Sequence, residues 1–139
     1  MDKSSLSREQ VAERLRLHGI NLTHQRLEIA CVLYSRMEHL SADQILTAVN
    51  QSHAATSKAT VYNTLNLFVE KKLIREVIVD PNKTFYDPNT EPHYHLYDTV
   101  TGQLTDIAAA QIEVTGLPPI PPGSVVDGID IIVRTRPAA

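Results

Sequence analysis

The sequence has one cysteine, no tryptophan and no long run of apolar residues. With Cys31 alone, no internal disulfide can form, and no CxxC pair exists to build a zinc site with four cysteine ligands. Any metal must therefore be held by nitrogen and oxygen. No apolar stretch is long enough to span a bilayer, and the polar start MDKSSLSREQ lacks the apolar segment of a signal peptide, so we expect a cytoplasmic protein without membrane contact.

An excess of positive charge is also absent. The formal net charge is −3, which argues against a general nucleic-acid binder, because contacts to phosphate need Lys and Arg. The acidity is uneven, however. Residues 1–80 carry ten Lys or Arg against nine Asp or Glu, and residues 81–139 carry three against seven. An N-terminal surface can therefore still be locally basic.

Capping residues predict four helices in the first half of the chain. The first starts with a capping box of Ser7 and Gln10 and ends at Gly19, and the others start at Thr23, Ser41 and Ser57. Helical spacing marks one apolar face on each. The expected core residues are Val11, Leu15, Leu27, Ala30, Cys31, Tyr34, Ile45, Leu46, Val49, Val61, Leu65, Phe68 and Val69.

The hydrophobic period then changes from helical to alternating. LIREVIVD and KTFYD are β-rich runs on either side of the turn DPNK, which predicts a hairpin. Helices followed by a two-stranded ribbon are typical of a winged helix-turn-helix, whose helix pair would be the third and fourth helices, joined through residues 50–56. We therefore expect a winged-helix DNA-binding domain over residues 1–88.

A second, smaller unit is expected over residues 89–139, after the linker NTEP. Its pattern predicts a strand HYHLYD, a turn at Gly102, a strand QLTDI, a helical stretch AAAQIEV, the loop GLPPIPPGS and a strand VDGIDIIVRT. A unit of this size buries little of its surface, so pairing with a second copy is expected, with IDIIV as either an interface strand or a core strand. The predicted fold class is α+β: an N-terminal winged helix-turn-helix and a small α/β dimerisation domain.

The start of the fourth helix, SKATVYNT, is the candidate DNA-reading segment. It offers a cation for phosphate, hydroxyl and amide groups for hydrogen bonds, and an aromatic ring for thymine methyls or phosphate. The alternative is a solvated polar face. Its position favours DNA, because this end of the second helix of a helix-turn-helix enters the major groove. The candidate residues are Lys58, Thr60, Tyr62, Asn63 and Thr64.

The stretch EPHYHLYD contains a candidate metal site. His93 and His95 point to the same side of a strand and Tyr94 to the other, so the two imidazoles either hold a metal or are simply polar strand positions. Three further side chains are possible partners: Asp87 at the end of the hairpin, Asp106 after the Gly102 turn, and His39 before the third helix. Imidazole with carboxylate suits Fe(II), Mn(II) or Zn(II), and five such ligands favour an ion that accepts more than four. One ion would then tie the two units together.

Two His and one carboxylate can also form the facial triad of a non-haem iron enzyme. The chain has no substrate-sized second domain, and five ligands leave little coordination room. We therefore expect a regulator and not an enzyme.

LTHQRLEIACVL, HLSADQI, ATVYNTLNLFVEKKLI and HYHLYD…TGQLTDI resemble the ferric uptake regulator family of metal-responsive, dimeric DNA-binding repressors, over nearly the whole chain. The resemblance implies a homodimer on a double-stranded operator. It also implies a regulatory metal site at His39, Asp87, His93, His95 and Asp106. The paired CxxC zinc site common in the family is absent here.

LIREVIVDPNKTFYD, GLPPIPPG and IDIIVRTRP are most similar to the iron response regulator branch of that family. This similarity implies control of iron homeostasis, with haem as a further candidate ligand. Many members of the branch have three consecutive histidines where this chain has His93, Tyr94 and His95, and Cys31 is followed by Val32, so no Cys-Pro haem motif exists. The His/Asp set also resembles that of the peroxide-responsive branch, in which bound Fe(II) reacts and a ligand histidine is oxidised.

Overall fold

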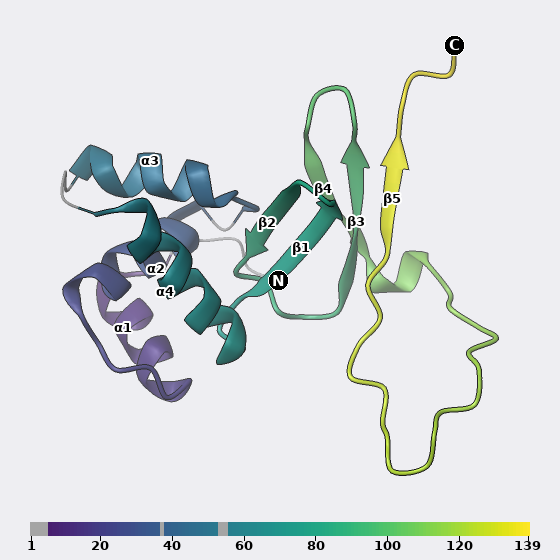
Figure 1. Cartoon of the computed structure of the whole chain (residues 1–139), viewed down its shortest axis with the longest axis horizontal. Coiled ribbons are helices and arrows are strands. Elements are labelled where there is room, and N and C mark those ends of the chain that lie inside the picture. The colour runs from purple at the N-terminus through teal and green to yellow at the C-terminus, as the bar shows by residue number, and fades with distance from the viewer. Residues whose placement is uncertain (1–5, 37, 53–55) are drawn as a thin grey trace. The chain divides into compact units, whose positions relative to one another are not determined.

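The computed structural model describes residues 6–36, 38–52 and 56–139, and the chain divides into two compact units, Met1–Thr90 and Glu91–Ala139. The first unit contains α1 (Arg8–Leu17), α2 (His24–Arg36), α3 (Ala42–Ser52), α4 (Lys58–Glu70), β1 (Arg75–Asp80) and β2 (Lys83–Asp87) (Figure 1). The second contains β3 (His93–Asp98), β4 (Leu104–Ala108), the short 3₁₀ helix η1 (Ala109–Gln111) and β5 (Ile132–Thr135). None of the described helices is long and apolar enough to cross a membrane.

The four predicted helix starts are confirmed by their capping contacts. In α1, Ser7 Oγ accepts from the Gln10 amide at 3.2 Å, and Gln10 Oε1 accepts from the Ser7 amide at 2.8 Å. Ser41 and Gln44 repeat this box before α3, at 3.2 and 2.9 Å. Single side-chain caps precede the other two helices: Thr23 Oγ1 accepts from the Arg26 amide and Ser57 Oγ from the Thr60 amide, both at 3.1 Å.

The end of α1 follows the predicted signal as well. Gly19 has φ +72°, a conformation that a residue with a side chain adopts only at a cost. The Ile20 amide donates to the Leu15 carbonyl at 2.9 Å, which closes the helix end.

The core of the first unit lies among all four helices, the residues Leu73 and Ile74 before β1, and Tyr86 near the end of β2. Nine of the expected core residues are buried, namely Val11, Leu15, Ala30, Tyr34, Ile45, Val49, Val61, Leu65 and Phe68. Leu27, Cys31, Leu46 and Val69 are only partly buried, packed against this core. Ile29 and Leu33 are fully buried but were not expected there. Since α2 contacts α1, α3 and α4, its apolar face is wider than a single stripe.

The hairpin of the first unit forms as predicted. β1 pairs with β2 antiparallel, and Glu76 lies opposite Tyr86. At the turn, Asp80 Oδ1 accepts from the Asn82 amide at 2.8 Å, a local bond typical of aspartate in turns. Together with α3 and α4, this hairpin completes the predicted winged helix-turn-helix order (Figure 1).

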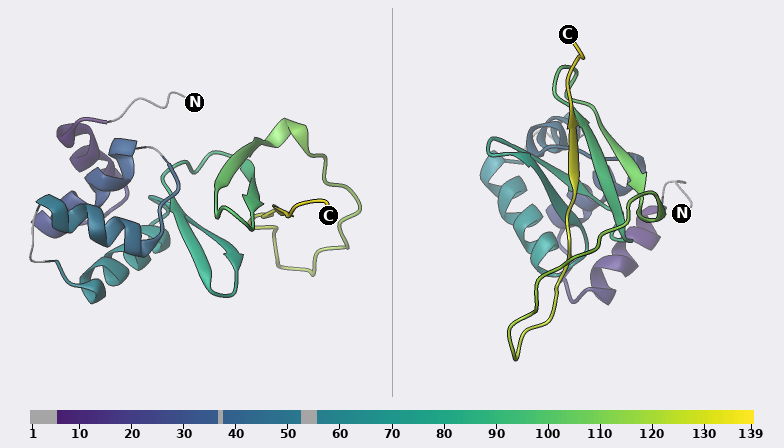
Figure 2. Two further views of the ribbon diagram at one scale, coloured as in Figure 1. Left: turned by 90° about the horizontal axis from the view of Figure 1, so that it is seen from above. Right: turned by 90° about the vertical axis from the view of Figure 1, so that its right-hand side faces the viewer.

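The second unit is built around one sheet with strand order β4-β3-β5. β3 pairs antiparallel with β4 and parallel with β5, and the right-hand view of Figure 2 shows the three strands side by side. The turn between β3 and β4 contains Gly102, with φ +75°. The predicted strands at HYHLYD and QLTDI are therefore confirmed.

Two expectations for the second unit were wrong in extent. The stretch AAAQIEV, residues 108–114, forms only the three-residue η1. A helix of seven residues has too few backbone hydrogen bonds to offset the entropy lost in forming its first turn. The strand expected over residues 126–135 forms only at Ile132–Thr135, where β3 offers a pairing partner. Residues 113–130 lie exposed between them, as a long excursion that leaves the sheet and returns (Figure 1).

Candidate metal centre and nucleic-acid interface

The first group of candidate ligands is formed by His39 and Asp87, both in the N-terminal unit. Leu40 and Tyr86 form an isolated antiparallel bridge, with amide-to-carbonyl distances of 3.2 and 2.8 Å. In an antiparallel pair, the residue before one partner lies opposite the residue after the other. His39 Nε2 accordingly lies 3.2 Å from Asp87 Oδ2.

The two side chains of this group are held before any ion binds. Asp87 is buried, with 2% of its surface exposed, and its Oδ1 accepts from the Asn89 amide at 2.9 Å. This bond occupies one carboxylate oxygen and leaves the other beside His39. A buried carboxylate is costly unless it is paired, so a cation here would be favourable.

The second group is formed by His93, His95 and Asp106 in the C-terminal unit. The register of β3 and β4 places His95 directly opposite Asp106, and the alternation of β3 turns His93 to the same face. The Nε2 atoms of His93 and His95 lie 3.6 and 3.7 Å from Asp106 Oδ1, and the ring centroids are 4.5 Å apart. Both histidines are buried.

His93 is oriented by a contact behind its ring. Its Nδ1 lies 2.6 Å from the Glu91 carbonyl oxygen, which can only accept a hydrogen bond. The Nδ1 atom therefore carries the hydrogen, and in the neutral ring Nε2 presents a lone pair on the side of Asp106. Ligating histidines commonly donate the other ring N–H to a carbonyl in this way.

The donor chemistry of both groups fits a divalent metal. Within each unit the structure brings the predicted residues together: His39 with Asp87, and His93 with His95 and Asp106, whose ligand atoms all lie within 4.8 Å of one another. Imidazole nitrogens and carboxylate oxygens suit Fe(II), Mn(II) and Zn(II).

The start of α4 presents most of the predicted DNA-contacting residues to solvent. Lys58, Tyr62 and Asn63 are exposed and Thr60 is partly exposed, whereas Thr64 is 7% exposed and shares the buried face of α4 with Val61. The burial of Thr64 does not suit a side chain expected to contact DNA. The spacing explains it, because Thr64 follows Val61 by three residues and so lies on the same helix face.

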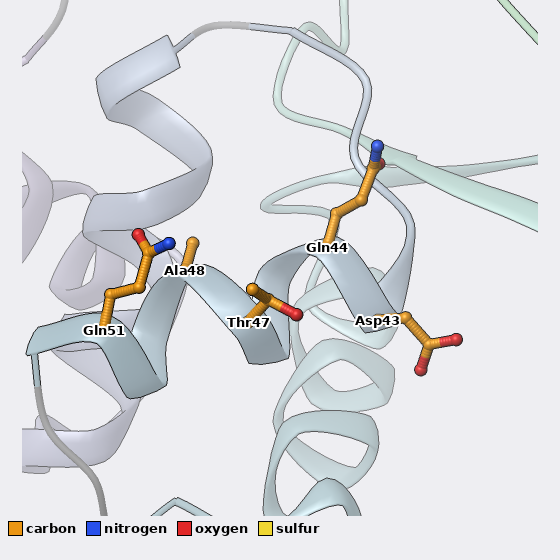
Figure 3. Close-up of a pocket in the computed structure, with 5 residues that line it drawn as sticks. All are labelled: Asp43, Gln44, Thr47, Ala48 and Gln51. Atoms are coloured by element: carbon orange, nitrogen blue, oxygen red, sulfur yellow. The ribbon is translucent and has the colours of Figure 1, made fainter.

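Lys58 has two neighbours in the structure. Its Nζ lies 3.9 Å from Asp43 Oδ1 and 5.8 Å from the centroid of the Tyr62 ring. Asp43 was not among the residues predicted to lie at the DNA-contacting surface. In the sequence, only its position in the first turn of α3 distinguishes it. Asp43 lines an open pocket on α3 together with Gln44, Thr47, Ala48 and Gln51 (Figure 3).

Fold and ligand groups together define a winged-helix protein able to bind a metal. Residues 17–117 match the Ferric uptake regulator family, and the chain belongs to that family. Its members are metal-responsive transcription regulators that bind DNA and act as dimers. Membership confirms the predicted family and the prediction that the protein is not an enzyme, and it removes the non-haem iron enzyme from consideration.

Similar proteins include two named Peroxide-responsive repressor PerR. The one from Staphylococcus aureus (strain Mu50 / ATCC 700699) is 32% identical over 104 residues, which cover 75% of this chain and 70% of the repressor. The one from Staphylococcus epidermidis is 30% identical over 105 residues, which cover 76% and 70%. Neither is named as an iron response regulator, so that branch stays a prediction.

Solved structures confirm the fold class. The ferric uptake regulator from Pseudomonas aeruginosa with manganese superposes with a TM-score of 0.71 at 21% identity, covering 92% of this chain and 98% of that one. The Helicobacter pylori ferric uptake regulator, described as having three functional metal binding sites, gives 0.69 at 21% identity, covering 98% and 95%. At these identities the likeness is evidence for the fold alone.

Proposed function

We propose that this protein is a metal-dependent DNA-binding repressor, in which His39, Asp87, His93, His95 and Asp106 all bind one divalent ion. The observation that carries the proposal is the organisation of the ligands: each group is assembled within its own unit, and Asp87 and His93 are each oriented by a backbone contact. Only residues 88–92 separate the last ligand of the first group from the first ligand of the second.

The ion would act by selecting one orientation of the two units. An ion that binds one orientation about 100-fold more tightly than another supplies roughly 2.7 kcal/mol, which changes the populations substantially. The N-terminal unit would bind DNA through Lys58, Thr60, Tyr62 and Asn63, with Thr64 supporting α4 from its buried side. The C-terminal unit would pair the two copies and so set the spacing of the operator half-sites.

DNA affinity measured with and without metal tests this proposal. A duplex selected by the Mn(II)-loaded protein from a random-sequence pool would be titrated with metal-free, Mn(II)-loaded and Zn(II)-loaded protein, using fluorescence anisotropy. We expect the metal-loaded forms to bind at least about tenfold more tightly, which corresponds to about 1.4 kcal/mol. Equal affinity in all three states would contradict metal control.

Metal stoichiometry tests whether the two ligand groups share one ion. We expect one Mn(II) per chain by equilibrium dialysis, and its loss in both His39→Ala and His95→Ala. Glu13→Gln, on the exposed face of α1, is a control that should keep the ion. Two ions per chain, each removed by only one of the histidine variants, would show that the groups bind separately.

Peroxide sensing is the second candidate, favoured by the names of the two staphylococcal relatives. In that case, with Fe(II) bound, a ligand histidine gains one oxygen atom from peroxide, and water is the other product. Peptide mass spectrometry after peroxide treatment would locate the added oxygen on His39 or His93. An unmodified Fe(II)-loaded protein that keeps its DNA affinity would exclude this candidate.

Haem sensing rests on the likeness of GLPPIPPG and IDIIVRTRP to the iron response regulator branch. We expect a haem ligand to come from the histidines and not from Cys31, which lies in the helix α2, is followed by Val32 and is only partly exposed. Titration with haem, followed by absorption spectroscopy in the wild type and in His93→Ala, distinguishes a specific complex from surface adsorption. A spectrum unchanged by the substitution would argue against haem at this site.

A further inference from the structure

Asn50 lies in the last turn of α3. Both polar atoms of its side-chain amide form hydrogen bonds with the backbone of a single residue, Thr56, which follows the helix. Its Nδ2 donates to the Thr56 carbonyl at 3.1 Å, and its Oδ1 accepts from the Thr56 amide at 3.3 Å. One side chain thereby pairs with the donor and the acceptor of the same backbone residue. Among side chains of this length, only asparagine offers both a donor and an acceptor in this geometry.

Thr56 needs these partners because it is 9% exposed. A buried backbone N–H or C=O that loses its partner destabilises the conformation that buries it. Thr56 also directly precedes Ser57, the N-cap of α4. Ser57 Oγ in turn accepts from the Thr60 amide at 3.1 Å and lies 3.0 Å from Thr60 Oγ1. A continuous chain of contacts therefore runs from the end of α3 to the first turn of α4.

We infer that Asn50 is a positioning residue for DNA reading, which fixes the start of α4 relative to α3 through Thr56. The inference rests on the proposed function, because α4 carries Lys58, Thr60, Tyr62 and Asn63. Both polar ends of the Asn50 amide are engaged by Thr56, so its role is to orient the residues that touch DNA. Removal of the Asn50 side-chain amide would misalign the contacts of α4 with the bases, while the attraction of Lys58 for phosphate would remain.

The contact itself is tested by amide hydrogen exchange in the full-length, metal-loaded protein. Asn50→Ala removes both bonds, and Asn50→Asp keeps the acceptor for the Thr56 amide while losing the donor. Gln51→Ala is the matched control, because Gln51 is the neighbouring residue on the exposed face of α3 (Figure 3). We expect exchange at the Thr56 amide to rise about tenfold in Asn50→Ala, less in Asn50→Asp, and not at all in Gln51→Ala.

The consequence for DNA is tested with two duplexes of equal length, one selected from a random-sequence pool by the wild type and one scrambled. We expect Asn50→Ala to bind the selected duplex about tenfold more weakly, the cost of one misplaced base contact, and to bind the scrambled duplex within about twofold of the wild type. Mn(II) affinity should not change. Gln51→Ala should match the wild type on both duplexes.

The outcomes separate this inference from the proposed function. A wild type that does not distinguish the duplexes contradicts the proposed function. A wild type that does distinguish them, with Asn50→Ala distinguishing them equally well, overturns the role of Asn50 alone. Unchanged exchange at Thr56 in Asn50→Ala overturns it as well. If Asn50→Ala does not fold, Asn50→Asp decides the matter by the same two measurements.

Discussion

The two units of this protein bury very different kinds of residue. The N-terminal unit has a continuous apolar core that draws on all four helices and on the hairpin. In residues 91–139, all of which the structure describes, four residues are buried: His93, His95, Tyr97 and Leu104. Half of these are candidate metal ligands. The first unit is thus organised by the burial of apolar side chains, and the second by a polar ligand group on a small sheet.

Exposed apolar residues are a second difference between the two units. Eight of the large hydrophobic residues with exposed side chains lie beyond residue 110 or in the β3–β4 turn: Val100, Val114, Leu117, Ile120, Val125, Val126, Ile129 and Val133. A unit with so few buried apolar side chains cannot draw much stability from its own core. We expect its stability to depend on a bound ion and on pairing with a second copy.

The largest expected effect is on the core of the first unit. Phe68→Ala removes a fully buried ring and should lower the free energy of unfolding by about 3–5 kcal/mol, through lost transfer energy and the cavity left behind. Val125→Ala, at a residue 89% exposed, should change it by less than about 0.5 kcal/mol. Urea denaturation followed by circular dichroism measures both. Similar values for the two variants would remove the contrast between the units.

Metal removal should act mainly on the second unit. At a free ion concentration about 100 times the dissociation constant, binding stabilises the folded form by roughly 2.7 kcal/mol. On addition of EDTA to the Mn(II)-loaded protein, we therefore expect hydrogen exchange to accelerate in β3 and β4 and to stay slow in α2 and α4. Equal acceleration in the helices would show that the units do not differ in this way.

Two glycines provide a matched pair across the units. Gly19 and Gly102 have φ of +72° and +75°, and an added Cβ would meet nothing within 4 Å at either position. Alanine should therefore cost about 1–2 kcal/mol at each, from the backbone alone. In Gly19→Ala the loss should appear as a lower melting temperature.

In Gly102→Ala the same loss should appear as weaker Mn(II) binding, by about tenfold, because we expect metal binding and folding to be coupled in this unit. Calorimetric titration and thermal melts of both variants would measure this. An undiminished Mn(II) affinity in Gly102→Ala would contradict the coupling.

The smallest expected effect concerns Asp98 in the β3–β4 turn. Its carboxylate accepts from the amides of Thr101 and Val100, and these bonds hold the pKa of Asp98 below 3.8, the ordinary value for aspartate. Because the folded pKa is the lower one, the contribution to stability is present above about pH 3.8 and is lost as the pH falls below it. Carboxyl NMR titration checks this. An Asp98 midpoint at or above 3.8 would contradict the turn contacts.

Local signals were enough to predict most of the first unit. The caps at Ser7, Thr23, Ser41 and Ser57 lie where the sequence placed them, because a cap and its partner are only three residues apart. The β3 and β4 strands were equally clear from alternation and from the Gly102 turn. Burial was harder to predict for α2, where Ile29 and Leu33 are buried by packing against several helices.

What the sequence by itself determined about this protein is most of its elements, its family and the residue types able to bind metal, since these depend on neighbours along the chain. Only the tertiary structure brings His39 to Asp87 across the Leu40–Tyr86 bridge and engages Asn50 with Thr56. It also limits β5 to Ile132–Thr135. These features depend on backbone pairing and packing between segments that meet only when the chain folds, and no local pattern records them.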